Sequence, residues 1–225
     1  MPLQIAIDGP VASGKSTVAR RLAQRLECPF LDTGALYRAV AFAVLAHGIS
    51  ADDERTVASF ARTLEPKVEA AKTPLGYRIR VEGRALGDEL FSAIVSRAVS
   101  AIAANAEVRA HLIDAQRTFA DDRDVVMAGR DIGSVVLPGA AFKFFLTASL
   151  DARVDRRLKE LQDAGIAIER ATLRQEIERR DERDRTRRAS PLVAAADAIE
   201  IDTSALSIDE VVDKLESIVR GSPRR

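Results

Sequence analysis

The chain has 225 residues, of which 47% are hydrophobic and 30% charged, with no tryptophan. This length can bury a core large enough for one domain, and the composition is that of a soluble, helix-rich α/β protein rather than a disordered chain. Lys and Arg number 34, as do Asp and Glu, so the balanced charge gives no reason to expect binding to nucleic acid or to an anionic membrane.

Cysteine usage and hydropathy indicate a cytoplasmic protein. Cys28 is the single cysteine, so an internal disulfide cannot form. The opening residues MPLQIAIDG lack both the charged and the long apolar segment of a secretory signal. Apolar stretches such as VVLPGAAFKFFL are interrupted well short of the roughly 20 residues that cross a membrane. We therefore expect no membrane segment.

The N-terminal third alternates strands and helices. The apolar run from Leu3 to Ile7 predicts a buried parallel strand that leads into a glycine-containing loop. A helix follows over 16–27, because apolar residues recur there every four positions, and Pro29 ends it. Downstream, the patterns predict a strand over 29–31, a helix over 35–47 and a helix over 52–64.

The periodicity changes from Pro66 to Gly87, where a Pro-Leu-Gly break separates two alternating segments. This pattern predicts a small antiparallel hairpin. A mainly parallel core needs no such hairpin between its second and third strands, so we interpret it as part of an insertion that continues through a helical segment over 90–104. The insertion would therefore contain a small antiparallel sheet and helices.

Three further strands complete the predicted core, over 125–127, 142–147 and 198–201. Five strands that alternate with helices predict an α/β fold with a doubly wound, five-stranded parallel sheet. The last helix begins at a capping box, in which Ser207 precedes Glu210 by three residues, and ends near Gly221.

The loop after the first strand has the pattern G-x-x-x-x-G-K-[ST] and is typical of a nucleoside triphosphate site. Its backbone N–H groups and the following helix N-terminus would hold a polyphosphate. Lys15 would reach the β- and γ-phosphates, and the Ser16 hydroxyl would be a ligand of Mg²⁺. A chance glycine turn is the alternative, but four fixed positions between a strand and a helix disfavour it. The candidate ATP-binding residues are Gly9, Pro10, Val11, Ala12, Ser13, Gly14, Lys15, Ser16 and Thr17.

Two absences favour a kinase over other proteins that share this loop. The chain has no N-K-x-D tetrapeptide, which a guanine-binding protein normally carries, and its strand VVMAGRD does not end in the paired acidic residues of a mechanical ATPase. A phosphate monoester has a second pKa of about 6, so it needs no base to accept a phosphoryl group, but two polyanions must be brought together. Arginine suits that task, because its planar guanidinium binds phosphate in a bidentate manner.

Arginines cluster in two predicted helices, with Arg153, Arg156 and Arg157 in one and RRDERDRTRR, residues 179–188, in the other. The second run is compatible with a solvated helix face that carries i,i+4 ion pairs. Helical periodicity places two triplets each on one face. They are Arg180, Asp184 and Arg187 on one and Asp181, Arg185 and Arg188 on the other, and spacing alone does not choose between them.

The segment LDTGALYR follows the second strand, at the sheet edge where ligands of open α/β sheets collect. Thr33 and Arg38 could face an acceptor nucleotide there. An N-capping Thr33 and a surface Arg38 fit the spacing equally well.

Five segments together resemble the bacterial cytidylate kinase family of P-loop nucleoside monophosphate kinases, in order and over nearly the whole chain. They are IAIDGPVASGKST, LDTGALYR, GRDIGSVVLPGA, RRDERDR and SPLVAAADAIEIDTSALSIDEV. The resemblance implies in-line transfer of phosphate from ATP to CMP and dCMP with Mg²⁺, by a monomer. It also implies a core over 1–32, 105–150 and 171–225, a nucleoside monophosphate-binding region over 33–104, and a short helical lid over 151–170.

The resemblance also implies roles for particular residues. The acceptor site would consist of Thr33, Arg38, Ser100, Arg109, Arg130, Asp131, Arg180, Asp184 and Arg187, which selects the first of the two triplets. The catalytic residues would be Lys15, Arg130, Asp131, Arg180 and the lid arginines Arg153, Arg156 and Arg157. The lid arginines would close positive charge over the transferring phosphoryl group. Asp131 and Asp184 would read the cytosine or contact the sugar, because a carboxylate accepts from the cytosine amino group.

Ala128 departs from the family pattern, because relatives commonly carry an acidic residue just before Gly-Arg-Asp. The role of that carboxylate would be absent or taken over by Asp32 or Asp131. The alternatives are a P-loop kinase for another acceptor, such as UMP, AMP or a metabolite alcohol, and a switch whose triphosphate occupancy moves the insertion to grip a partner.

Overall fold

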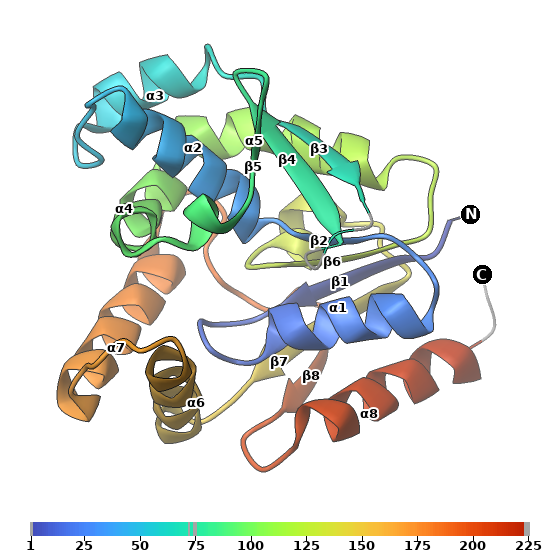
Figure 1. Ribbon diagram of the computed structural model, residues 1–225. Coiled ribbons are helices and arrows are strands. Elements are labelled where there is room, and N and C mark those ends of the chain that lie inside the picture. The colour runs from blue at the N-terminus through green and yellow to red at the C-terminus, as the bar shows by residue number, and fades with distance from the viewer. Residues whose placement is uncertain (1, 72, 74–75, 223–225) are drawn as a thin grey trace.

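A five-stranded parallel sheet forms the centre of the computed structural model, which describes residues 2–71, 73 and 76–222 (Figure 1). The strand order is β2-β6-β1-β7-β8. These strands are β1 (Gln4–Asp8), β2 (Phe30–Asp32), β6 (Val125–Gly129), β7 (Phe142–Thr147) and β8 (Ile199–Asp202). Every neighbouring pair is parallel, which confirms the five predicted strands and the predicted fold class.

The helices surround this sheet (Figure 1). They are α1 (Lys15–Arg25), α2 (Gly34–Ala46), α3 (Glu54–Ala61), α4 (Ala93–Ala104), α5 (Ala106–Ala120), α6 (Leu150–Asp163), α7 (Arg170–Thr186) and α8 (Ile208–Gly221), with short helical turns η1 (Asp88–Phe91) and η2 (Ile132–Val136). Helix α1 packs on both β6 and α8, and α6 packs on α7. Within the described residues, no helix has the length and apolar character needed to cross a membrane.

A second, antiparallel sheet lies between β2 and β6 in the sequence. It has three strands, β3 (Lys67–Ala70), β4 (Tyr77–Val81) and β5 (Arg84–Leu86). The predicted hairpin is therefore extended by a third strand, which pairs back on β4 after a two-residue turn. The alternating residues of β4, from Tyr77 to Val81, are buried as their pattern predicts.

Two helical segments are shorter than predicted, because a side-chain cap begins one of them and a residue with extended backbone interrupts the other. Helix α3 begins after Asp53, whose Oδ1 accepts from the Thr56 backbone N–H at 3.0 Å. The helical segment over 90–104 breaks at Ser92, which has ψ 154 and separates η1 from α4. The predicted capping box at the start of α8 is present.

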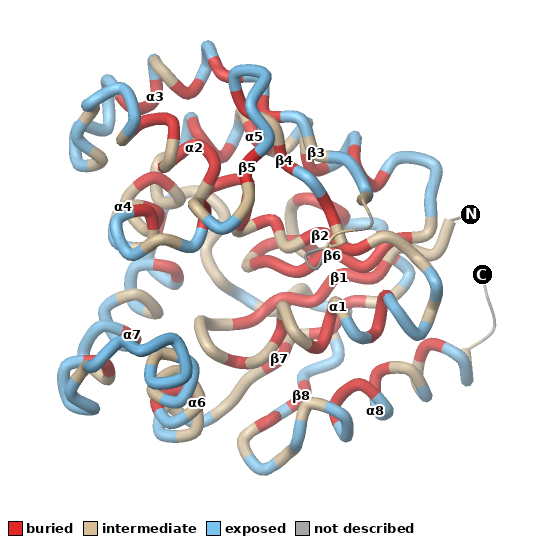
Figure 2. Tube along the Cα trace, viewed as in Figure 1, coloured by how far each residue is buried: buried red, intermediate tan, exposed pale blue. Residues whose placement is uncertain are grey.

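The hydrophobic core has one large and one small part. Buried residues follow the central strands and the helix faces against them (Figure 2). The small part joins α6 to α7 and contains Val154, Leu173 and Ile177. Val11, in the glycine loop, packs against this small cluster. The α6–α7 pair thus contacts the phosphate-binding loop through a core of its own.

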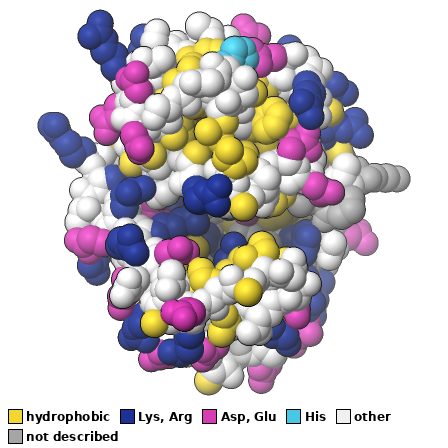
Figure 3. All heavy atoms as spheres, turned by 60° about the vertical axis from the view of Figure 1, so that its left-hand side comes forward, with side chains coloured by type: hydrophobic (Ala, Val, Ile, Leu, Met, Phe, Trp, Pro, Cys, Tyr) yellow, Lys and Arg dark blue, Asp and Glu magenta, His cyan; other side chains and the backbone are white. Residues whose placement is uncertain are grey.

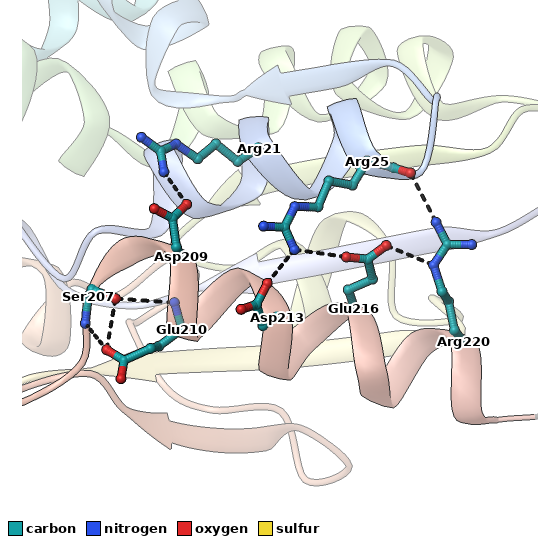
Figure 4. A network of polar contacts seen from close by, with 8 residues as sticks. All are labelled: Arg21, Arg25, Ser207, Asp209, Glu210, Asp213, Glu216 and Arg220. Atoms are coloured by element: carbon teal, nitrogen blue, oxygen red, sulfur yellow. Dashed lines mark hydrogen bonds and ion pairs between the residues drawn. The ribbon is translucent and has the colours of Figure 1, made fainter.

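An exposed ion-pair network joins α1 to α8 (Figure 4). Arg25 pairs with Asp213 and Glu216 of α8. Arg220 donates to Glu216 at 2.8 Å and to the Arg25 carbonyl at 3.0 Å. Beneath these contacts, Leu215 is fully buried. The helix that follows the glycine loop is therefore held by apolar packing below and charge pairs above.

We expect the buried contacts of α8 to stabilise the protein more than its surface ion pairs. Leu215→Ala should lower the free energy of unfolding by about 2–5 kcal/mol, because it leaves a cavity in the core. Asp213→Asn should have a much smaller effect, because water and salt screen exposed pairs. Urea unfolding of both variants tests this order. An Asp213→Asn loss as large as that of Leu215→Ala would contradict it.

Candidate functional site

The glycine loop joins the C-terminal end of β1 to the start of α1, as its sequence pattern predicts. Gly9 has φ 151, and a Cβ there would lie 2.2 Å from the Leu146 carbonyl oxygen. Gly14 has φ 85, the left-handed region that favours glycine. Both glycines are therefore required by the path of the backbone, which turns sharply between the sheet and the helix.

The polar groups of this loop fit a bound polyphosphate. Ser13 is 1% exposed, and its Oγ is one of the buried polar atoms without a hydrogen-bond partner among the described residues. Helix α1 has no side-chain cap, so its first N–H groups remain available to an anion. Lys15 donates to the Pro10 carbonyl at 2.9 Å. Burial and the neighbouring Arg130 lower the pKa of Lys15, which favours binding of a compensating anion.

Asp8 links the glycine loop to the Gly-Arg-Asp turn that follows β6. Its two carboxylate oxygens accept from the backbone N–H groups of Ile132 and Gly133, both at 2.8 Å. Burial outweighs these bonds and raises the pKa of Asp8 to about 6. The sequence placed Asp8 only at the end of a strand, and no local pattern indicates a partner more than a hundred residues away.

A pocket opens between α2, α4, α7 and the Gly-Arg-Asp turn, beside the glycine loop. All nine residues predicted for the acceptor site line it: Thr33, Arg38, Ser100, Arg109, Arg130, Asp131, Arg180, Asp184 and Arg187. They come from five separate segments of the chain, so the fold brings together residues that are far apart in the sequence. Their individual roles stay predictions.

Two arginine–carboxylate pairs occupy the inner wall of this pocket. Arg109 Nη2 pairs with Asp131 Oδ2, and both side chains are almost completely buried. Arg130 Nε donates to Asp184 Oδ2 at 2.8 Å. Arg109 Nε and Arg187 Nη2 are buried without a partner among the described residues. The wall therefore offers charged N–H donors to which a ligand could supply hydrogen-bond acceptors.

Positive charge dominates the electrostatics of the pocket. Burial and the nearby Arg130 lower the pKa of Arg180 to about 10, so its guanidinium remains charged at neutral pH. Burial opposes ionisation of Asp184, but Arg130, Arg180 and Arg187 outweigh it and hold its pKa below the ordinary value. Asp184 is therefore an ionised acceptor surrounded by cations.

The structure distinguishes the two triplets of α7. Asp184 and Arg187 are buried, and both line the pocket with Arg180. Arg185 lies on the exposed face, where it pairs with Glu182 at 2.5 Å. The first triplet thus faces the pocket, and the solvated-face interpretation applies only to the other side of the helix.

Thr33 and Arg38 also face the pocket rather than serve as a cap and a surface residue. Thr33 makes no side-chain cap bond, and its Oγ1 donates to the Ala128 carbonyl at 3.1 Å. Arg38 donates to the Leu90 carbonyl at 3.2 Å and to Ser96 Oγ at 2.8 Å.

The three arginines of the predicted lid have different surroundings. Arg153 pairs with Asp181 at 2.5 Å, and Arg156 donates to Thr203 Oγ1 at 3.0 Å. Arg157 pairs with Glu160 at 2.8 Å and lines a cleft next to the pocket. In this conformation, only Arg157 of the three lines the cleft, within the part of the chain that is described.

This cleft between α4 and α7 is strongly basic. Figure 3 shows Lys and Arg side chains gathered around a hollow in the surface. The arginines that line the cleft are Arg38, Arg97, Arg157, Arg179, Arg180 and Arg183, against a single carboxylate, Glu176. The local charge is therefore suited to a polyanion although the whole chain is neutral.

Two polar pocket residues lie outside the predicted acceptor set: Asp32, which the sequence indicated only as a possible replacement carboxylate, and Tyr37. Asp32 ends β2, and its Oδ1 accepts from the Gly34 backbone N–H at 2.9 Å. The Tyr37 ring lies beneath the Arg109 guanidinium at 5.1 Å. Tyr37 follows Thr33 by one helical turn, a spacing that places both on one face and that could have indicated it.

Ala128 is fully buried in β6, where its register partners are Ile7 of β1 and Asp32 of β2. No carboxylate therefore projects from this strand end. Asp131 forms an ion pair with Arg109, whereas Asp32 accepts from a backbone N–H and has no ion pair among the described residues. Of the two carboxylates that could replace the missing one, Asp32 is thus the more available.

The raised pKa of Asp8 predicts a pH dependence of stability. Between the ordinary value of 3.8 and the folded value of about 6, the folded protein keeps a proton that the unfolded chain loses. The free energy of unfolding that Asp8 contributes therefore falls by about 3 kcal/mol as pH rises through this range and stays low above it.

Urea unfolding of the wild type and of Asp8→Asn, over about pH 4 to 7, measures this term. The free energy of unfolding of the wild type, relative to that of Asp8→Asn, should be about 3 kcal/mol higher at the acidic end of this range than at the neutral end. Parallel pH profiles would show that Asp8 does not titrate as described.

Comparison with known proteins shows the family of this chain. The family model for cytidylate kinase matches residues 5–221. Cytidylate kinase from Alkaliphilus oremlandii is 42% identical over 97% of this chain and 98% of its own length. That from Caldanaerobacter subterraneus is 42% identical over 98% and 96%. The solved structure of shikimate kinase from Bacteroides thetaiotaomicron has a TM-score of 0.50 at 15% identity, covering 97% of this chain and 98% of that one, a likeness of fold alone. The chain belongs to the cytidylate kinase family.

Proposed function

We propose that this kinase transfers the γ-phosphoryl group of ATP to CMP and dCMP and so forms CDP and dCDP. The observation that carries the proposal is a pocket beside the glycine loop, where charged residues from separate segments of the chain converge. The family membership supports the same reaction. Kinases for other acceptors and nucleotide-dependent switches lack comparable support.

The acceptor phosphate would lie against Arg38, Arg130 and Arg180. Arg38 and Arg180 line both the pocket and the basic cleft, so they stand where donor and acceptor would meet. Because a phosphate monoester is largely deprotonated at neutral pH, no general base is required. The protein's contribution is to align the two nucleotides and to neutralise their charge.

The cytosine would be read by the buried arginine–carboxylate pairs. A carboxylate accepts from the N4 amino group, whereas uracil would place its O4 oxygen against the same carboxylate. Asp131 and Asp184 are the candidates, and Arg109 and Arg187 would satisfy their unpartnered donors on the base or sugar. The pocket would discriminate strongly against a base that leaves these buried polar groups unpaired.

The ATP phosphates would bind Gly9 to Thr17, with Lys15 against the β- and γ-phosphates. Ser16, in the first turn of α1, would be a ligand of Mg²⁺. When bound, Mg²⁺ would neutralise charge on the β- and γ-phosphates. A hydroxyl and the carboxylate of Asp32 are the oxygen donors that Mg²⁺ prefers, so the residues present fit the ion. Lys15, Arg130, Arg157 and Arg180 would stabilise the charge of the transition state.

The division of the chain follows from these roles. We assign 1–32, 105–150 and 171–225 to the core, 33–104 to the acceptor-binding region and 151–170 to the lid. Each contributes to the pocket or the adjoining cleft: Asp131 from the core, Arg38 and Ser100 from the acceptor-binding region, and Arg157 from the lid. We further propose that the enzyme acts as a monomer in the cytoplasm.

Parallel assays with different acceptors test the proposed function. Release of ADP from Mg-ATP is measured with CMP, dCMP, UMP, AMP, GMP or no acceptor. CMP and dCMP should stimulate release far above the others. Equal stimulation by UMP would contradict the proposed recognition of cytosine. Slow release of ADP that no acceptor stimulates would support a nucleotide-dependent switch instead.

Lys15→Ala should lower turnover by about 100-fold or more, because it removes a cation from the transferring phosphates. Circular dichroism and thermal unfolding should show that the variant remains folded. Turnover near that of the wild type would show that the glycine loop has no catalytic role.

Arg187→Ala should raise the KM for CMP about tenfold or more, because a buried charged donor to the acceptor is lost. Arg185→Ala is the matched control, since Arg185 lies on the exposed face of the same helix, and its KM should stay within about twofold of the wild type. Equal values for the two variants would count against the assigned pocket.

A further inference from the structure

Arg153 connects three parts of the molecule although it lies almost entirely out of solvent. Its Nε donates to the Ala148 carbonyl at 3.2 Å. Its Nη1 donates to the Val11 carbonyl at 3.2 Å and to Asp181 Oδ2 at 2.5 Å. With 9% of its side chain exposed, this arginine of α6 holds the glycine loop on one side and α7 on the other.

Val11 is attached to the same unit through its side chain. It packs against the small cluster formed by Val154, Leu173 and Ile177 of α6 and α7, two helices that lie side by side in Figure 1. The glycine loop therefore meets the helix pair twice, by the carbonyl and by the apolar side chain of one residue. A change in the path of the loop would act on both contacts.

Asp181 holds one face of α7 against α6 through its pair with Arg153. Successive helical residues are rotated by about 100°, so a fixed Asp181 against α6 directs Arg180, Asp184 and Arg187 to the pocket. Asp181 Oδ1 is buried without a hydrogen-bond partner among the described residues, which leaves Arg153 as the one polar contact of this carboxylate there. Leu173 and Ile177 of the small cluster precede Asp181 by two turns and one turn, so the ion pair extends the same face of α7 that packs against α6.

We propose that Asp181 is a positioning residue that couples occupancy of the glycine loop to the acceptor pocket through Arg153. A triphosphate that orders the loop fixes the Val11 carbonyl, Arg153 and Asp181, and thereby the three pocket residues of α7. Arg153 acts in this way through its neighbours and not by contact with the transferring group. The inference rests on the proposed function, because it requires ATP in the loop and CMP in the pocket.

The test measures CMP affinity calorimetrically with and without a non-hydrolysable ATP analogue and Mg²⁺. In the wild type, the analogue should tighten CMP binding about fivefold or more, and CMP should tighten analogue binding by the same factor. Asp181→Asn should keep both sites but bring that factor close to one. Asp181→Glu, which retains the charge, should recover part of it.

Glu182→Gln is the matched control, because Glu182 is exposed on the same helix and pairs only with Arg185 among the described residues. It should leave the coupling factor unchanged. Thermal unfolding of each variant separates the coupling from a general loss of stability. An unchanged factor in folded Asp181→Asn, or no coupling in the wild type, would overturn the inference. Failure of wild-type CMP to bind or to stimulate ADP release would instead overturn the proposed function.

Discussion

The carboxylate of Asp8 joins the two halves of the site, and the rest of the arrangement depends on it. It ends the central strand β1 and accepts from the Ile132 and Gly133 N–H groups, so the glycine loop and the turn that carries Arg130 cannot move independently. Its burial raises its pKa, which is the energetic cost of placing an acceptor there. Because both segments follow neighbouring parallel strands, this one contact fixes donor and acceptor groups on the same edge of the sheet.

The site holds far more positive charge than the neutral composition of the chain suggests, and two devices keep this compatible with folding. Buried arginines pair with Asp131 and Asp184 inside the pocket, while the arginines of the adjoining cleft remain partly hydrated. Donors that stay unpartnered, such as Arg187 Nη2, are then available to a nucleotide. A polyanion would therefore relieve both charge repulsion and unsatisfied hydrogen bonding in the site.

Local patterns sufficed to predict the five parallel strands, the glycine loop and the capping box at Ser207, because each depends on neighbours in the sequence. The strand β5 escaped prediction because three residues are too few to establish an alternation. Periodicity could not select a face of α7, since both triplets repeat equally well, and the choice follows from tertiary contacts with α6, including the pairing of Asp181 with Arg153. The composition of the acceptor site came from family resemblance, whereas Asp8 and Tyr37 required the structure.

In the proposed mechanism, the pocket between α2, α4 and α7 receives the acceptor nucleotide. A crystal structure of the protein with CMP and a non-hydrolysable ATP analogue tests it most directly. We predict electron density for the acceptor phosphate against Arg38, Arg130 and Arg180, with the base and sugar against Arg109, Asp131, Asp184 and Arg187. Well-defined CMP bound elsewhere, with these side chains still paired only to one another, would contradict the account.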